Sequence, residues 1–380
     1  MIYFDHAATT PLDREVFEKM QPYFTELYGN ADSLHAYGRK AQGAVDGARD
    51  RLASLLNANP KEIYFTSGGT ESDNWALLGV AEGLKAQGKT EILLSSIEHH
   101  AVLAAAERLQ TSGFTVRYLP VNAEGYVEPT TLENALTDRT GLVGVMAANN
   151  ETGVVQPVRA LSDLAHARGA LFFTDAVQAA PYLPVDVKAW GADLLALSAH
   201  KFYGPKGVGA LYVKNGVRIS GLVTGGEQER GLRGGTLNVA GAVGLAYAYE
   251  KAVQGQAETN ARVLALTEEL YARLSELGGV SRNGGGERLP AVLNVRIEGV
   301  ENTAFLLNMD LKGVAISVGA ACASASTKPS HVLLAMGRSE KEAGESVRFS
   351  LGKGNTLEEV ERAAELAKET VLRLRGFSKA

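Results

Sequence analysis

The sequence predicts an α/β protein in which a large domain with a mostly parallel sheet is joined to a smaller α+β domain. The chain has 380 residues, a usual length for two domains. Short apolar runs alternate with longer amphipathic segments over most of it, as in parallel sheets with helices on both faces. After the glycine cluster at 284–286 this alternation gives way to mixed strands and helices.

The large domain should contain its strands at regular intervals along the chain. Near-continuous apolar runs predict strands at 62–66, 91–95, 141–147, 171–174, 193–197 and 209–213. Amphipathic segments between them predict helices, one ending near residue 87 and others beginning near 101 and 158.

The C-terminal third should form the smaller domain. A long helical stretch at about 238–277 leads into the glycine cluster, which predicts a loop. The elements expected after it are a strand at 291–297, a helix at 301–311, a short strand near Ile316, a strand at 346–351 and a final helix. We assign residues 15–250 to the large domain, and residues 1–14 and 251–380 to the small domain.

The composition argues against several classes of function. Lys and Arg number 38 and Asp and Glu 43, a net charge of −5, whereas proteins that bind nucleic acids or membrane surfaces carry a basic excess. No apolar run approaches the ~20 residues that span a bilayer, and the N-terminus lacks the features of a secretory signal. We therefore expect a cytoplasmic protein without nucleic-acid or membrane partners.

The chain has a single cysteine, Cys322. A lone cysteine excludes a disulfide within the chain and a thiolate metal cluster. The 7 histidines are scattered without metal-ligand spacing, so we predict no metal site.

A Gly-rich turn at 67–72 follows the first predicted strand. Its backbone N–H groups could hold a phosphate at the start of the next helix. Taken alone, the turn is more commonly an ordinary capped helix start. The usual nucleotide phosphate loops are absent from the sequence.

Two later strand ends carry polar residues suited to a ring cofactor. Asp175 ends one strand, and Gln178 lies one turn further on. The carboxylate of Asp175 could pair with a protonated ring nitrogen. The commoner role of an Asp at this position is to cap the next segment. Lys201 follows four apolar residues together with Ser198 and His200, where desolvation favours a neutral amine for Schiff-base chemistry.

An acid and a Schiff-base lysine together with a phosphate turn predict pyridoxal 5'-phosphate. His99, after the strand at 91–95, could stack on the cofactor ring. His100 is adjacent and must diverge from it, so the two cannot serve one site.

These motifs together resemble the cysteine desulfurases, pyridoxal-phosphate enzymes related to the class V aminotransferases. The similarity extends from 3–11 (YFDHAATTP) to 348–352 (RFSLG). Between them lie 66–72 (TSGGTES), 98–99 (EH), 149–156 (NNETGVVQ), 175–178 (DAVQ), 198–201 (SAHK), 230–236 (RGLRGGT) and 321–326 (ACASAS). The resemblance implies the type I fold of pyridoxal-phosphate transferases.

The resemblance also implies a role for each site residue. Lys201 would bond to the cofactor and later move protons at the substrate carbons, while Asp175 would pair with the ring nitrogen and His99 would stack on the ring. The remaining cofactor contacts would be Gly69, Thr70, Asn150, Gln178, Ser198, His200 and Thr236. Thr236 would reach the phosphate from a second subunit, which implies a homodimer. Arg348, Asn150 and Asn30 would contact the substrate.

Cys322 is the residue on which the predicted activity depends. From residue type alone, a free cysteine is more often buried and inert. Its neighbours are small residues without apolar periodicity, which favours a loop. The resemblance implies that Cys322 takes the sulfur of L-cysteine as a persulfide, leaving L-alanine, and passes it to an acceptor protein for iron–sulfur clusters or tRNA thiolation.

Two other activities remain compatible with the same residues. Selenocysteine lyase or cysteine-sulfinate desulfinase chemistry would not require the cysteine. An ordinary class V aminotransferase would need a keto-acid acceptor and would leave the side chain of the donor intact.

Overall fold

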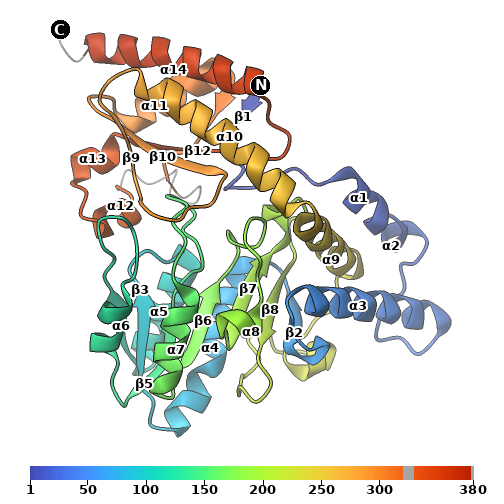
Figure 1. Cartoon of the computed structure of the whole chain (residues 1–380). Coiled ribbons are helices and arrows are strands. Elements are labelled where there is room, and N and C mark those ends of the chain that lie inside the picture. The colour runs from blue at the N-terminus through green and yellow to red at the C-terminus, as the bar shows by residue number, and fades with distance from the viewer. Residues whose placement is uncertain (320–328, 378–380) are drawn as a thin grey trace.

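A seven-stranded sheet forms the centre of the larger lobe (Figure 1), as seen in a computed structural model that describes residues 1–319 and 329–377. Its strands lie in the order β2-β8-β7-β6-β5-β3-β4. The strands are β2 (Ile63–Thr66), β3 (Glu91–Ser95), β4 (Thr115–Leu119), β5 (Thr140–Gly144), β6 (Leu171–Asp175), β7 (Leu194–Ser198) and β8 (Gly209–Val213). β8 runs in the opposite direction to the other six strands of this sheet, so its pairings with β2 and β7 are antiparallel and the remaining pairings are parallel. The predicted α/β class with a mostly parallel sheet is therefore confirmed.

β4 is a strand that was not expected from the sequence. This strand lies at the edge of the sheet, and Arg117 and Tyr118 within it are exposed. Edge strands need not be apolar throughout, so a search for continuous apolar runs misses them.

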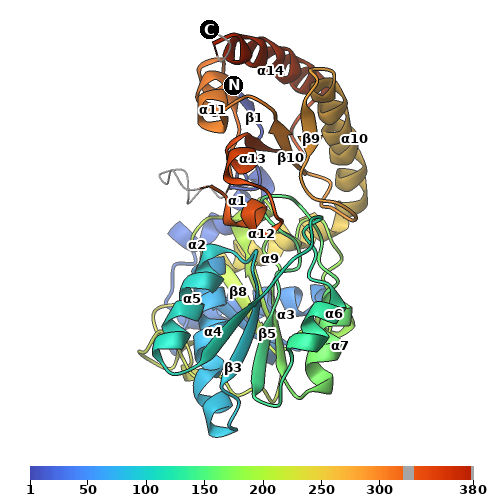
Figure 2. The same cartoon turned by 90° about the vertical axis from the view of Figure 1, so that its left-hand side faces the viewer.

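Helices cover both faces of this sheet (Figure 2). α4 (Gly69–Ala86) and α5 (His100–Thr111) enclose a core on one face that includes Trp75, Ile92 and Phe173. The other helices of this lobe are α1 (Arg14–Met20), α2 (Pro22–Thr25), α3 (Ala36–Leu55), α6 (Pro129–Ala135), α7 (Val158–Ala167), α8 (Val187–Trp190) and α9 (Val239–Gln254). With both faces covered, the carboxyl ends of the parallel strands are left as the open edge at which ligands bind.

The smaller lobe contains two short sheets. β9 (Val280–Arg282), β10 (Val292–Ile297) and β12 (Ser346–Ser350) form an antiparallel sheet, and β1 (Ile2–Tyr3) pairs with β11 (Val314–Ala315). The helices here are α10 (Gln256–Ser275), α11 (Asn302–Leu311), α12 (His331–Ala335), α13 (Glu340–Gly344) and α14 (Leu357–Phe377). The pairing of β1 with β11 supports grouping the N-terminus with the C-terminal third, and we keep the domain division of the sequence analysis as a proposal.

The single long helix predicted at about 238–277 is wrong. The structure has two helices there, α9 and α10, which separate at Gly255. The N–H of Gly255 still bonds to the carbonyl of Lys251 at 3.1 Å, but its φ and ψ of −94° and 4° are not helical. Glycine is a weak helix former, so the chain can turn there from the larger lobe into the smaller one (Figure 1).

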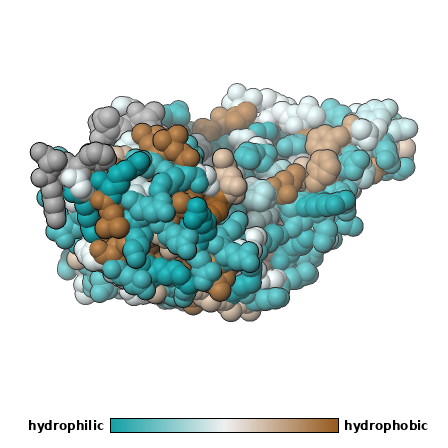
Figure 3. Space-filling model, turned by 90° about the horizontal axis from the view of Figure 1, so that it is seen from above, coloured by the Kyte–Doolittle hydropathy of each residue, from teal (hydrophilic) through white to brown (hydrophobic). Residues whose placement is uncertain are grey.

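The surface seen from the smaller lobe is mostly hydrophilic (Figure 3). Apolar side chains on this face lie in separate small groups. Among the described helices, none is long and apolar enough to cross a membrane.

Replacing Trp75 by Ala tests how α4 is held on the sheet. Trp75 is fully buried, lies edge-on to Tyr64, and donates a hydrogen bond from its indole N–H to the Ser220 carbonyl at 2.8 Å. We expect Trp75→Ala to lower the free energy of unfolding by about 3–5 kcal/mol, measured by urea unfolding followed by circular dichroism. Trp190 is only partly buried, so Trp190→Ala is the matched control with a smaller loss. Equal losses would contradict this account.

Candidate active site

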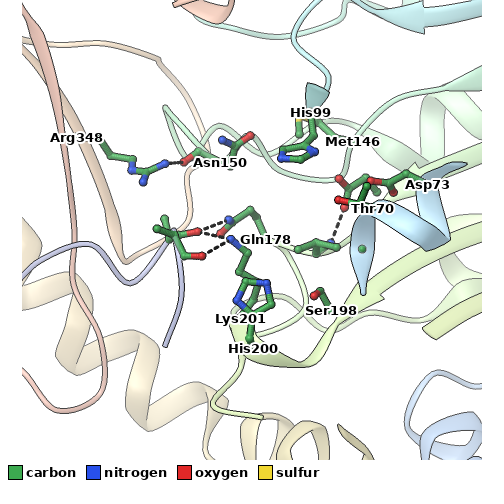
Figure 4. A pocket seen from close by; sticks show the side chains of 15 residues that line it. Thr70, Asp73, His99, Met146, Asn150, Gln178, Ser198, His200, Lys201 and Arg348 are labelled. Carbon is green, nitrogen blue, oxygen red and sulfur yellow. Dashed lines mark hydrogen bonds between the residues drawn. The ribbon is translucent and has the colours of Figure 1, made fainter. Parts of the chain in front are cut away.

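A cavity of about 190 Å³ lies at the carboxyl ends of the parallel strands (Figure 4). Its lining residues are Ala7, Ala8, Gly69, Thr70, Asp73, His99, Met146, Asn150, Asp175, Val177, Gln178, Ser198, His200, Lys201 and Arg348. In Figure 4, Arg348 and Asn150 lie at one end and Thr70 and Ser198 at the other, with Lys201 and Gln178 between them. The cavity therefore joins residues from distant parts of the sequence.

Lys201 lies in the short helical turn η2 (Ala199–Lys201) directly after β7. Its Nζ donates hydrogen bonds to the carbonyl oxygens of Ala7 at 2.6 Å and Ala8 at 2.9 Å. The side-chain amide of Gln178 donates to the same Ala7 carbonyl at 2.8 Å. The N-terminal segment thus fixes the position of the amine. This role of the Ala7 and Ala8 carbonyls was not expected from the sequence.

Asp175 lies at the end of β6, and its Oδ1 accepts a hydrogen bond from the N–H of Val177 at 2.8 Å. This is the capping contact that the sequence analysis gave as the commoner role of such an Asp. It uses only one of the two carboxylate oxygens. Burial raises the pKa of Asp175 to about 6, while the nearby charge of Lys201 acts to lower it. A protonated ring nitrogen beside this carboxylate would stabilise its charged form.

The turn before α4 is built for an anion. Gly68 has φ of 154°, and a Cβ on Gly69 would lie 2.9 Å from Cγ2 of Val177, so both positions require glycine. The capped helix start weighed above is not observed, because the N-cap Gly68 has no side chain to accept hydrogen bonds. The first backbone bond at this end runs from Ser72 N–H to the Gly68 carbonyl at 3.1 Å. The preceding helix N–H groups are therefore available for an anion.

The two histidines of the cavity are neutral at physiological pH. The Nδ1 of His99 accepts a hydrogen bond from the N–H of Ala101 at 3.2 Å. Burial and then the charge of Lys201 lower the pKa of His99 to about 4, and the same two causes lower that of His200 to about 4. His100, by contrast, is exposed, and its ring contacts that of His331 in a tilted arrangement, with 4.8 Å between the ring centroids.

Arg348 on β12 is the second cationic side chain of the cavity and is only 1% exposed. Its Nη2 forms an ion pair with Oδ1 of Asp5 at 2.7 Å, and its Nη1 donates to the carbonyl of Asn150 at 2.8 Å. Its Nε has no hydrogen-bond partner within the described residues. The guanidinium is thus fixed in orientation and retains a donor.

Two buried acids near the cavity, Asp73 and Glu98, were given no role from the sequence, although Glu98 belongs to the motif 98–99. Asp73 lines the cavity one helical turn after Gly69, and its Oδ1 lacks a partner among the described residues. Glu98 accepts hydrogen bonds from the Ser95 hydroxyl at 2.5 Å and the Met146 N–H at 2.7 Å. Burial, with a smaller contribution from the charge of Asp175, raises the pKa of Glu98 to about 8. The four-residue spacing of Gly69 and Asp73 could have indicated the first of these acids.

Three predicted site residues are not found in this cavity. Asn30 and Thr236 are exposed and do not line it. Cys322 lies in the segment 320–328, outside the described residues. In the described ranges, no three His, Cys, Asp or Glu side chains are arranged to hold a metal ion.

The described residues of the cavity fit pyridoxal 5'-phosphate. The start of α4 offers N–H groups to a phosphate, Asp175 offers a buried acid to a ring nitrogen, and Lys201 offers an amine to an aldehyde. Among protein families, Aminotransferase class-V matches residues 2–363. The chain belongs to this family.

Similar class-V proteins support a narrower grouping with the cysteine desulfurases. A cysteine desulfurase IscS of Clostridium botulinum is 45% identical over 381 residues, covering 99% of this chain and 96% of the relative. A NifS-like protein of known structure has a TM-score of 0.92 at 38% identity, covering 97% of this chain and 98% of its own. A structure of SspA in complex with cysteine has a TM-score of 0.82 at 36% identity, covering 94% of this chain and 100% of its own.

These comparisons confirm the resemblance stated from the sequence and the fold expected from it. This class-V protein is an enzyme that depends on pyridoxal phosphate.

Glu98→Gln tests the protonation state of the buried acid in this class-V enzyme. The folded pKa of Glu98 is raised from 4.5 to about 8, so the wild-type carboxyl stabilises the fold most below pH 4.5. This contribution falls as the pH rises towards 8. We expect the melting temperature of the wild type to decline relative to Glu98→Gln between about pH 5 and 8, measured by scanning calorimetry. Parallel pH profiles would rule out a protonated Glu98.

Proposed function

We propose that this class-V enzyme is a cysteine desulfurase that converts L-cysteine to L-alanine and holds the sulfur as a persulfide on Cys322. The observation that carries the proposal is one cavity that combines an amine on Lys201, an acid on Asp175 and a fixed guanidinium on Arg348. The 45% identity to a cysteine desulfurase over the whole chain supports it.

The residues of the cavity divide the work between cofactor and substrate. Pyridoxal phosphate, when bound, supplies an aldehyde for the amino group of the substrate and a ring that accepts electrons. Asp175 would hold the proton on the ring nitrogen, and the start of α4 would hold the phosphate. Ser198 and His200 would support the phosphate, and Asn150 and Gln178 would contact the other ring substituents. His99, whose pKa is lowered to about 4, would stack on the ring as a neutral imidazole.

Lys201 and Arg348 act on the substrate. Arg348 binds the carboxylate, because a planar guanidinium already oriented by Asp5 offers donors in a fixed geometry. Lys201 moves protons at the substrate carbons. Its amine is within reach of two backbone carbonyls, which orient it when it carries a proton.

Cys322 takes part in the sulfur transfer itself. The thiolate of Cys322 attacks the substrate sulfur, so that an S–S bond forms while the C–S bond breaks. The electron pair of the C–S bond stays on the carbon, which takes up a proton and becomes the methyl group of alanine. No external oxidant is needed, because the substrate carbon is reduced as the two sulfurs are joined.

We also propose that the enzyme is a cytoplasmic homodimer that passes sulfur to an acceptor protein of iron–sulfur cluster assembly or tRNA thiolation. In support of a dimer, the segment 17–37 exposes several large hydrophobic side chains, namely Phe17, Phe24, Tyr28, Leu34 and Tyr37. Where such side chains gather into one patch, they mark a surface for association with another protein. Asn30 lies in the same region, and Thr236 is exposed in its own subunit, consistent with service to the other cavity.

Cys322→Ala is the direct test of the persulfide step. We expect cysteine turnover to fall by about 10²-fold or more, because the attacking sulfur is removed. The visible absorbance of the bound cofactor and the cleavage of selenocysteine should be retained, since neither requires the thiol. Alanine production from cysteine is measured without any keto acid, so an ordinary aminotransferase gives none. Unimpaired cysteine turnover in the variant would favour the lyase or desulfinase alternative.

Arg348→Lys tests the carboxylate contact. Lysine keeps the charge but cannot bind Asp5 and a substrate carboxylate with a planar pair of donors. We expect the KM for cysteine to rise about 10- to 100-fold, the loss of one charge-assisted hydrogen bond. Arg296→Lys, in an ion pair with Glu345 in the smaller lobe, is the control and should leave KM unchanged. A wild-type KM in Arg348→Lys would remove Arg348 from the substrate site.

A further inference from the structure

The segment 228–236, called here the 228–236 loop, contains Thr236 and is held by a buried ion pair. Nη1 and Nη2 of Arg49 on α3 donate to the two carboxylate oxygens of Glu229, at 2.8 and 2.7 Å. The side chain of Glu229 is fully buried and that of Arg49 is 9% exposed. Such a pair fixes geometry well, and removing one partner leaves an uncompensated buried charge.

The same ion pair is tied to the strand that leads into the phosphate turn. Arg49 donates to the carbonyl of Ile63 at 2.6 Å, and Glu229 accepts from the N–H of Phe65 at 3.1 Å. Both partners lie in β2, which ends at Thr66, directly before the turn. The ion pair therefore joins α3, β2 and the 228–236 loop.

The backbone at this corner is strained. Glu229 and Arg230 have φ of 46° and 61°, in the left-handed region that residues with side chains avoid. The guanidinium of Arg230 lies 3.9 Å from the ring centroid of Tyr64 and donates to the Ile63 carbonyl at 2.7 Å. Two adjacent residues in this conformation indicate that the surrounding contacts impose the path of the loop.

Beyond this corner the loop supports the phosphate turn of its own subunit. Arg233 forms an ion pair with Glu71 at 2.9 Å, and Glu71 accepts a hydrogen bond from the N–H of Ser67 at 2.8 Å. Ser67 and Glu71 lie on either side of Gly69 and Thr70. A shift of the 228–236 loop would therefore displace the phosphate turn at 67–72.

The outer side of the loop connects Asn30 and Thr236, the two described residues that were predicted for the site but do not line the cavity. Gln228 accepts from the N–H of Gly235, next to Thr236, at 3.0 Å and donates to Asp32 at 2.5 Å. The N–H of Asp32 in turn donates to the side chain of Asn30 at 3.0 Å. Thr236 and Asn30 are thus presented on one connected part of the surface.

We infer that the Arg49–Glu229 ion pair is a positioning element through which each 228–236 loop serves two cofactor sites. Through Arg233 and Glu71 the loop braces the phosphate turn of its own subunit, and through Thr236 it completes the cavity of the partner subunit. The inference rests on the homodimer of the proposed function. It makes Arg49 and Glu229 positioning residues, because neither lines the cavity.

Mixed dimers with one functional cavity distinguish the effect of the loop on the cavity of its own subunit from its effect on the cavity of the partner subunit. In the first, a subunit carrying both Lys201→Ala and Glu229→Gln pairs with a wild-type subunit, so the cavity with Lys201 receives Thr236 from the altered loop. In the second, Lys201→Ala pairs with Glu229→Gln, so the functional cavity has the altered loop itself. The readout is the rate at which Lys201-bound cofactor is lost on dilution, followed by its absorbance without cysteine.

We expect faster cofactor loss in both mixed dimers than in the dimer of Lys201→Ala with wild type, by about tenfold in the first. A first mixed dimer identical to that reference would overturn the inference. Because no substrate is used, failure of the desulfurase proposal would not affect this result.

Two further variants distinguish positioning from folding. The pair Arg49→Met with Glu229→Gln removes the uncompensated buried charge, so its melting temperature should return towards the wild type while cofactor loss stays fast. Glu345→Gln, which removes another buried acid from an ion pair, this one in the smaller lobe, should lower the melting temperature without changing cofactor loss. Recovery of cofactor retention together with the melting temperature would reduce the ion pair to a structural role and overturn the inference.

Discussion

The N-terminal segment is the constraint on which the site depends, because it holds both cationic side chains of the cavity. Asp5 forms an ion pair with Arg348 of the smaller lobe, and the carbonyls of Ala7 and Ala8 accept hydrogen bonds from Lys201 of the larger lobe. A few consecutive residues thereby fix the distance between the amine and the guanidinium. Catalysis by orientation requires such fixed geometry, since both groups must meet one small amino acid at once.

The electrostatics of the cavity suit a cofactor that carries a positive ring nitrogen and a negative phosphate. Three buried acids, Asp73, Glu98 and Asp175, lie around or beneath it, and burial raises the pKa of each. A ring cation would stabilise the nearest carboxylate, while the start of α4 lies where the phosphate is needed. A buried carboxylate would thus face the positive ring nitrogen, and the N-terminal end of α4 would face the negative phosphate.

Much of this could be predicted from the sequence, because the chemistry lies at the ends of buried strands. Asp175 and Lys201 each follow an apolar run. A parallel sheet brings the carboxyl ends of such strands to one edge, so the two residues come together regardless of the conformation of the loops. The break at Gly255 was missed because helical periodicity continues on both sides of it. Contacts made by backbone carbonyls, such as that of Ala7, leave no trace in residue type. The pairing of Arg49 with Glu229 joins positions 180 apart in the chain and has no local pattern.

The central claim is that sulfur leaves cysteine and is carried by Cys322, and mass spectrometry of the intact holoenzyme and its peptides tests it most directly. After a brief exposure to L-cysteine and blocking of free thiols, the account predicts one added sulfur atom on the peptide containing Cys322. With no other cysteine in the chain, a persulfide can form nowhere else. Stoichiometric release of alanine with no sulfur added to that peptide, even at the earliest times, would contradict the account.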